Sequence, residues 1–224
     1  MAKKLSSEGA KVIITGRNEE KLKSAVNEIK NDVKYVVYDV RKCKKNFINE
    51  VYNNYGKIDC IINNAGISLH EGNMLNVTNE GFQNQFDTNL KGAYFLAQEY
   101  IKKIKEDHQK EGNIIFISSE RGRQCDDIPY GLTKRAINSL VEGMSRRFYK
   151  EGIRVNAVAP GITASDMTNI KKEDDLFCDY NASGRFFMPE EVAEVVAFLV
   201  SDNSKCISGE IIHCDAGNHL NPWF

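Results

Sequence analysis

Short apolar runs rich in β-branched residues alternate with helical patterns along the whole chain, and this alternation limits the fold more than any other feature. The strand-like runs lie at residues 11–15, 35–38, 58–62, 113–117, 153–159 and 210–214. The helical patterns lie at residues 18–30, 43–54, 79–105, 129–150 and 189–200. Continuous apolar strands separated by helices indicate a parallel sheet that is covered on both faces. We therefore predict an α/β fold.

Composition excludes several classes of protein. The chain has 224 residues, a length that suits a single domain over residues 1–224. Its net charge of −1 gives no argument for binding nucleic acid or an anionic membrane. No apolar stretch approaches the roughly 20 residues of a membrane span, and no signal-peptide core follows Met1. We expect a cytoplasmic protein with neither a nucleic-acid nor a membrane partner.

The six cysteines lie far apart in the sequence, without a C-x-x-C spacing or clustered histidines. This pattern is typical of reduced thiols. We expect neither a disulfide framework nor a metal site.

Polar residues follow the predicted strands at the point where each strand ends. They are Asn63 and Asn64, Ser118 and Ser119, and the pair Pro160-Gly161. In open parallel sheets, ligands bind beyond the carboxyl ends of the strands. The sequence therefore predicts a binding site at this edge of the sheet.

Tyr130 and Lys134 are the strongest candidates for chemistry at that edge. Residues four apart share one face of a helix. Two unit charges about 4 Å apart attract by roughly 4 kcal/mol at an effective dielectric of about 20. An ammonium held there would lower the pKa of the phenol from about 10 and prepare it for proton transfer. The spacing alone is more typical of a solvated surface pair, so the surrounding motifs decide between the two interpretations.

Those motifs resemble the short-chain dehydrogenase/reductase family over nearly the whole chain. Besides the Tyr130/Lys134 pair, the residues that carry the resemblance are 59–66, 88–92, 117–119, 154–161, 189–193 and 207–217. Each motif is weak alone, but all of them occur in the family's order. The resemblance implies a doubly wound, Rossmann-type parallel sheet with helices on both faces. It also implies an enzyme that interconverts a ketone and a secondary alcohol with NAD(P).

The resemblance assigns four catalytic roles. Tyr130 would be the general acid in reduction and the base in oxidation. Lys134 would lower the pKa of Tyr130 and bind the nicotinamide ribose. Ser119 would hold the substrate oxygen, and Asn89 would anchor a water that connects Lys134 to solvent. Ser118 competes with Ser119, because the spacing of eleven residues from Ser119 to Tyr130 is shorter than is usual in the family.

The same resemblance places the cofactor. Arg17 follows the strand at 11–15, where an acidic residue would select NAD. A guanidinium there can instead pair with a 2′-phosphate, so we predict NADP(H), with NAD as the alternative. A solvated arginine at a helix start is the alternative explanation of Arg17. The other cofactor contacts implied are Asp39, Val40, Asn63, Ala65, Gly66, Tyr130, Lys134, Pro160, Gly161, Thr163 and Ser165.

The family's first strand and its glycine-rich phosphate-binding turn have no counterpart here, since the chain begins within the helix that follows them. The strand would lie in the middle of the sheet, between the strands at 11–15 and 58–62. We expect either that a longer reading frame carries it or that the chain is a truncated pseudoenzyme acting as an interaction module.

The substrate and the assembly are less constrained. The irregular segment at residues 162–188 would form a lid over the substrate, and its mixture of aromatic and charged residues indicates an amphipathic substrate. A 3-oxoacyl thioester is the first hypothesis, and sugar alcohols, steroids and other small ketones are alternatives. The resemblance also implies a homodimer or homotetramer built on the helices at 79–105 and 129–150. The apolar ending at residues 222–224 would be an interface tail.

Overall fold

The computed structural model describes residues 1–29 and 32–220. The last residue of the helix predicted at 18–30 and the predicted interface tail at 222–224 lie outside the described residues. The strands are β1 (Val12–Gly16), β2 (Val33–Val37), β3 (Cys60–Asn63), β4 (Gly112–Ile117), β5 (Ile153–Pro160) and β6 (Ile211–Cys214). The α-helices are α1 (Ala2–Ser7), α2 (Glu19–Ile29), α3 (Phe47–Tyr55), α4 (Asn79–Phe86), α5 (Gly92–Glu106), α6 (Pro129–Phe148) and α7 (Pro189–Val200).

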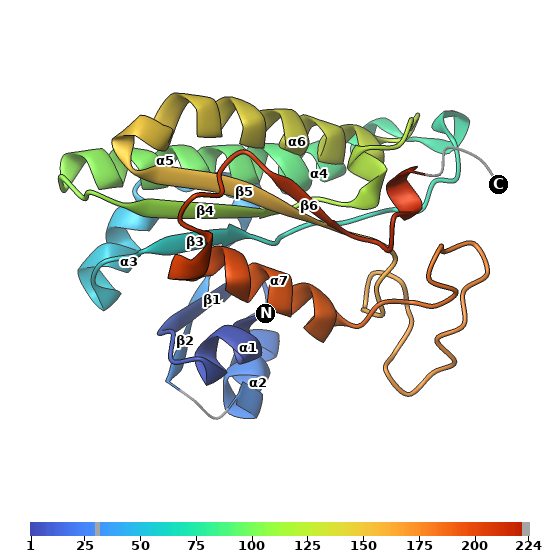
Figure 1. The fold of residues 1–224 in the computed structure, drawn as a ribbon, viewed down its shortest axis with the longest axis horizontal. Helices are drawn as coiled ribbons and strands as arrows, with labels where there is room; N and C mark the ends of the chain where they lie inside the picture. Colours follow the sequence, from blue (N-terminus) through green and yellow to red (C-terminus); the bar gives the residue numbers. More distant parts are fainter. Residues whose placement is uncertain (30–31, 221–224) are drawn as a thin grey trace.

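All strands pair in parallel, but they form two separate sheets. One sheet has the order β3-β4-β5-β6, and the other contains β1 and β2. Figure 1 shows the small sheet beside the main one. The break falls between β1 and β3, where the sequence predicted that a central strand is lacking. The prediction of an α/β fold with this gap is confirmed.

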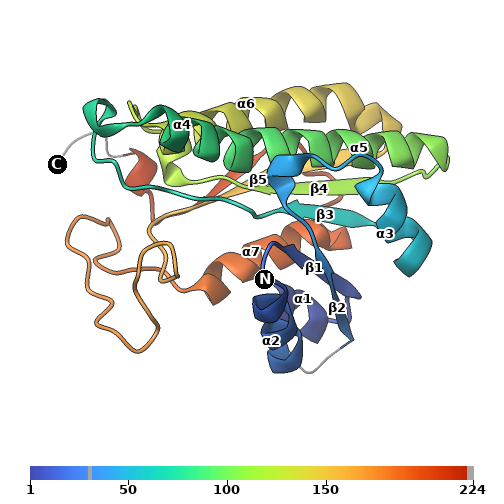
Figure 2. The same cartoon turned by 180° about the vertical axis from the view of Figure 1, so that it is seen from behind.

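Helices cover both faces of the main sheet, as predicted. Figures 1 and 2 show α5 and α6 along one face and α7 on the other. The two-residue period of the strands divides the core accordingly. Ile114 and Phe116 of β4 pack in the cluster with α3, α5 and α6, whereas Ile115 packs in the cluster with α7. A strand with two apolar faces therefore supports two layers of helices.

The helix predicted at 43–54 begins later than expected, at Phe47. A 3₁₀ turn (Val40–Lys42) precedes it, and Asp39 caps that turn by accepting a hydrogen bond from the backbone N–H of Arg41 at 3.1 Å. Cys43 and Asn46 then adopt left-handed conformations, with φ of 44° and 65°. A right-handed helix cannot pass through such residues.

The long helix predicted at 79–105 is also interrupted. A π-helical turn (Asp87–Lys91) separates α4 from α5. Gly92 follows this turn and lies so close to Val40 that an added Cβ would be 2.8 Å from the Val40 carbonyl oxygen. The π-helical turn is linked to a tertiary contact, because Gly92 packs against Val40, a residue more than fifty positions away in the chain.

In the part of the chain that the structure describes, no helix is both long enough and apolar enough to cross a bilayer.

Candidate active site

The four predicted catalytic residues come together beyond the carboxyl end of β4. Ser119 follows that strand and caps the 3₁₀ turn η4 (Glu120–Gly122). Tyr130 lies in the first turn of α6, and its side chain lies beside that of Ser119. Lys134 lies one turn later, with its Nζ 5.6 Å from the centre of the Tyr130 ring. The same Nζ donates to the carbonyl oxygen of Ile117 at 2.8 Å.

The structure gives the two neighbouring serines different surroundings. The hydroxyl of Ser118 donates to Oδ1 of Asn138 at 2.6 Å and lies in the buried interior against α6. Ser119 instead contacts Tyr130 and accepts a hydrogen bond from the backbone N–H of Arg121 at 3.2 Å. The geometry thus favours Ser119 for the role of substrate-oxygen donor.

Asn89 reaches the same group from the π-helical turn. Its amide is buried, donates to the Ile67 carbonyl at 2.9 Å, and accepts from the Ile67 N–H at 2.8 Å. It also donates to the hydroxyl of Thr133 at 3.1 Å. An added Cβ at Gly66 would lie 3.6 Å from Oδ1 of Asn89 and 3.5 Å from Nζ of Lys134, so Gly66 borders both. Sequence reasoning missed Thr133, although its position three residues after Tyr130 in α6 was a usable signal.

Burial governs the protonation of the Tyr130/Lys134 pair. Desolvation raises the pKa of Tyr130 above its ordinary value, and the hydrogen bond from Ser119 offsets this only in part. The net shift of the Tyr130 pKa is thus opposite to the lowering expected from Lys134, and the role of Lys134 stays a prediction. Burial lowers the pKa of Lys134 to about 8, since a charged ammonium is disfavoured away from water.

Several predicted cofactor residues line a cavity of about 270 Å³ at the break between the two sheets. Val40, Asn63 and Ala65 face it together with the backbone run of β1. Within the described residues, Nδ2 of the buried Asn63 has no hydrogen-bond partner. An unsatisfied buried donor is costly unless a ligand accepts from it. Asn63 therefore offers one free donor to a ligand at this cavity, whose other lining residues, such as Ile13 and Ile62, are largely apolar.

Arg17 and Asp39 lie at the same end of the small sheet. Asp39 forms an ion pair with Arg41, whose Nη2 lies 2.8 Å from Oδ2. The hydrogen bond from Arg41 lowers the pKa of Asp39, and the charge of Arg17 contributes to the same shift. Arg41 is a cation near the predicted cofactor site that sequence reasoning missed; its position two residues after Asp39 could have signalled it.

Pro160, Gly161, Thr163 and Ser165 lie where β5 passes into the irregular segment 162–188. Gly161 donates to the Cys214 carbonyl at 2.9 Å, and the hydroxyl of Thr163 donates to the Gly161 carbonyl at 2.9 Å. The Ser165 hydroxyl donates to the Thr163 carbonyl at 3.2 Å. A Cβ at Gly161 would come 2.9 Å from the Phe187 ring, so no larger residue fits without displacement. The two ends of the segment are held together by the backbone N–H of Phe187, which donates to the Ile162 carbonyl at 2.9 Å, and by that of Ala164, which donates to the Phe187 carbonyl at 2.9 Å.

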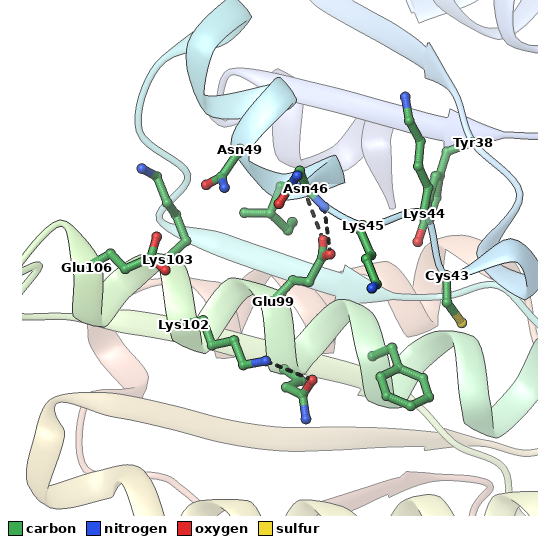
Figure 3. Close-up of a pocket in the computed structure, with 13 residues that line it drawn as sticks. Tyr38, Cys43, Lys44, Lys45, Asn46, Asn49, Glu99, Lys102, Lys103 and Glu106 are labelled. Atoms are coloured by element: carbon green, nitrogen blue, oxygen red, sulfur yellow. Dashed lines mark hydrogen bonds between the residues drawn. The ribbon is translucent and has the colours of Figure 1, made fainter.

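A second cavity, of about 440 Å³, lies between α3 and α5 and contains none of the predicted catalytic residues (Figure 3). Glu99 points into it and accepts from the backbone N–H groups of Asn46 at 2.9 Å and Ile48 at 3.4 Å. A carboxylate at a helix N-terminus stabilises that helix. We assign this carboxylate a structural role in holding α3 against α5.

Known proteins resemble this chain over nearly its whole length. The family model described as enoyl-(acyl carrier protein) reductase matches residues 1–219. The chain is 34% identical over 221 residues to the 3-oxoacyl-(acyl-carrier-protein) reductase FabG of Rickettsia felis, covering 97% of this chain and 90% of that protein.

Two solved structures have a similar fold. One is a 3-ketoacyl-(acyl-carrier-protein) reductase from Brucella melitensis complexed with NADH, with a TM-score of 0.88, 27% identity, and coverage of 97% of this chain and 91% of that one. The other is a gluconate 5-dehydrogenase from Burkholderia cenocepacia in complex with NADP and tartrate. It has a TM-score of 0.87, 26% identity, and coverage of 98% and 89%.

Proposed function

Because this chain belongs to the short-chain dehydrogenase/reductase family, we propose that it is an NADP(H)-dependent oxidoreductase that interconverts a ketone and a secondary alcohol. The observation that carries the proposal is the contact of Ser119 with Tyr130 above a buried Lys134. Two hydroxyl groups so close together support the proposal, because one substrate oxygen could accept a hydrogen bond from each.

The residues divide the chemistry between them. When bound, the dinucleotide supplies the hydride. The hydroxyls of Ser119 and Tyr130 hold the carbonyl oxygen, and Tyr130 transfers its phenolic proton to that oxygen as negative charge develops. Lys134 returns a proton to the phenolate. Asn89 fixes the backbone at Ile67 beside the lysine, and we propose that it orients the water that connects Lys134 to solvent.

NADP(H) is the proposed cofactor, because Arg17 and Arg41 supply guanidinium groups near the end of β1. A 2′-phosphate would pair with such groups, whereas a free ribose hydroxyl gains less from them. NAD remains the alternative, and Asn63, Ala65 and Val40 would serve either dinucleotide.

The proposed substrate is a 3-oxoacyl thioester, supported by the likeness to the Rickettsia felis reductase. The segment 162–188 would act as the lid over it, since Gly161 and Phe187 hold its ends beside the carboxyl end of β5. We place the enzyme in the cytoplasm as one domain over residues 1–224.

We propose a homodimer or homotetramer that uses the groove between α5 and α6. Tyr94, Ile101, Leu140 and Met144 line this groove, and the Tyr94 side chain is 44% exposed. An apolar groove between two long helices is suited to packing against a second copy of itself.

A second function of a different class follows from the break in the sheet. Within the described residues, β1 and β3 are each at the edge of a sheet, because β1 pairs with β2 and β3 pairs with β4. Each of these two strands therefore has one side with unpaired backbone groups. A chain with such a break could bind partners without turning over cofactor, as a pseudoenzyme. Cofactor binding separates the two functions.

The test is a titration with NADPH and with NADH that follows nicotinamide fluorescence. Reduction of acetoacetyl-CoA is then measured, with Tyr130→Phe as the inactive control. We expect tighter binding of NADPH and loss of turnover in the variant. A folded chain that binds neither nucleotide would contradict the enzymatic proposal. A chimaera with a β-strand and glycine-rich turn placed before Met1 would then show whether the break is the cause.

A further inference from the structure

One asparagine joins the catalytic serine's segment to the irregular segment 162–188. Asn218 lies in the 3₁₀ turn η7 (Asn218–Leu220), just beyond β6. Its Nδ2 donates to Oε2 of Glu120 at 2.9 Å, and its Oδ1 accepts from the backbone N–H of Ala182 at 3.2 Å. Glu120 directly follows Ser119, and Ala182 belongs to the segment 162–188. The amide nitrogen of Asn218 therefore binds one segment, and its amide oxygen binds the other.

The position of Asn218 is fixed from behind by Asp215, which is 1% exposed. The Asp215 carboxylate accepts from the backbone N–H of Gly217 at 3.0 Å and of His219 at 2.9 Å, and it contacts Nδ1 of His219 at 2.7 Å. The ring of His219 in turn stacks on His213, with centroids 3.7 Å apart. A turn with these contacts presents the asparagine amide in one orientation.

The turn around Ala182 is held together by its own bonds. The backbone N–H of Cys178 donates to the Gly184 carbonyl at 3.0 Å, and Nδ2 of Asn181 donates to the Arg185 carbonyl at 2.8 Å. Figure 1 shows the segment 162–188 as a long loop that extends away from the sheet. The bond between Ala182 and Asn218 therefore attaches a preformed turn, as a unit, to the end of β6.

Glu120 is the other end of the connection and is itself largely buried. Desolvation raises its pKa, and the hydrogen bond from Asn218 opposes that change by favouring the carboxylate. The charged or titratable groups around it are Arg121 on the same turn, Asp215 beyond β6, and His219 of η7. A neutral amide donor suits this place, because another carboxylate would leave two acceptors facing each other.

We propose that Asn218 is a positioning residue that fixes the segment 162–188 relative to Ser119 and Tyr130, and thereby sets substrate affinity. The inference rests on the proposed function for its kinetic consequence. Its structural consequence, an attached turn at Ala182, does not depend on catalysis. Glu120 separates Asn218 from the reacting atoms. Asn218 therefore acts through the two segments that it joins.

The kinetic test uses Asn218→Asp, Glu120→Gln and the double variant, with NADPH and acetoacetyl-CoA. Asn218→Asp faces Glu120 with a second carboxylate, so we expect KM for acetoacetyl-CoA to rise roughly tenfold at pH 8 with kcat within about twofold. The rise should shrink as the pH is lowered, because protonation lets the two carboxyl groups share a proton.

The double variant exchanges the donor and the acceptor of the hydrogen bond between positions 120 and 218, and it is the most specific control. Its new amide at position 120 would donate to the new carboxylate at position 218, whose second oxygen still accepts from the backbone N–H of Ala182. We expect KM within about twofold of the parent chain and no added pH dependence. Glu120→Gln alone should stay near the parent, since a glutamine oxygen can still accept from Asn218. The parent and this single variant also correct for the pH dependence of other groups over the same pH range.

Hydrogen exchange of the backbone amide of Ala182 gives a readout that needs no activity. It should be protected in the parent chain, unprotected in Asn218→Asp, and protected again in the double variant. If this pattern appears in a chain without reductase activity, the proposed function fails and the attachment stands. If Asn218→Asp changes neither KM nor exchange, or if the double variant restores neither, the inference is wrong.

Discussion

Replacing Lys134 with methionine should stabilise the fold in a manner that depends on pH. The side chain is 4% exposed, and burial lowers its pKa from 10.5 to about 8. A difference of about 2.5 between these pKa values, at 1.36 kcal/mol each, corresponds to about 3 kcal/mol. Below pH 8 both the folded and unfolded chains carry the ammonium, so the folded state bears the whole penalty. Between about pH 8 and 10.5 the unfolded chain binds more protons, and the stability of the parent chain rises.

The assay is urea unfolding of the parent and Lys134→Met at several values between about pH 7 and pH 10. The lost hydrogen bond to the Ile117 carbonyl shifts the variant by a constant amount, because a neutral amine can also donate. The advantage of the variant should therefore fall by most of about 3 kcal/mol over that range. Lys102→Met, on the exposed side of α5, is the matched control for loss of a lysine. A pH-independent difference between the parent chain and Lys134→Met would refute the reasoning.

Three further predictions concern the cofactor, the core and the assembly. Arg17→Ala should raise KM for NADPH roughly tenfold and leave that for NADH within about twofold, as initial rates with each nucleotide would reveal. Gly161→Ala should lower the free energy of unfolding by about 1–3 kcal/mol, as urea unfolding would measure, because its Cβ would meet Phe187 and Asp215. Tyr94→Glu should yield monomers in sedimentation, whereas Phe198→Glu, equally exposed on α7, should not; unchanged assembly in the first variant would exclude the α5–α6 groove.

The sequence predicted the layers because their causes are local. Continuous apolar runs produced β4 and β5 within a residue of the expected bounds, and Pro189 placed the start of α7. The break between β1 and β3 was also predictable, since it follows from a strand that the sequence lacks. The grouping of Ser119, Tyr130 and Lys134 follows from the topology of the strand ends, and their roles remain a proposal.

The features that the sequence could not predict depend on contacts distant in the chain. The π-helical turn at Asp87–Lys91 exists where Gly92 packs against Val40, and a helical pattern alone contains no sign of it. Such turns are frequent at functional sites, and this one carries Asn89 into the buried group. The connection through Asn218 likewise joins residues 98 positions apart in the chain. No spacing rule within a helix or strand reaches that far.

The sign of the Tyr130 shift was missed because the four-residue spacing indicates proximity but not burial. Burial opposes the charged form of both groups, so it raises the pKa of Tyr130 and lowers that of Lys134 to about 8. At neutral pH the phenol therefore keeps its proton while the lysine is still mostly an ammonium. The ammonium is then the stronger acid of the two and can reprotonate a phenolate once Tyr130 has given up its proton. In the proposed mechanism, reduction would use this protonation state directly, whereas oxidation would first have to remove a phenolic proton against the raised pKa. We infer that desolvation, more than the charge of Lys134, sets the protonation of Tyr130 in this structure.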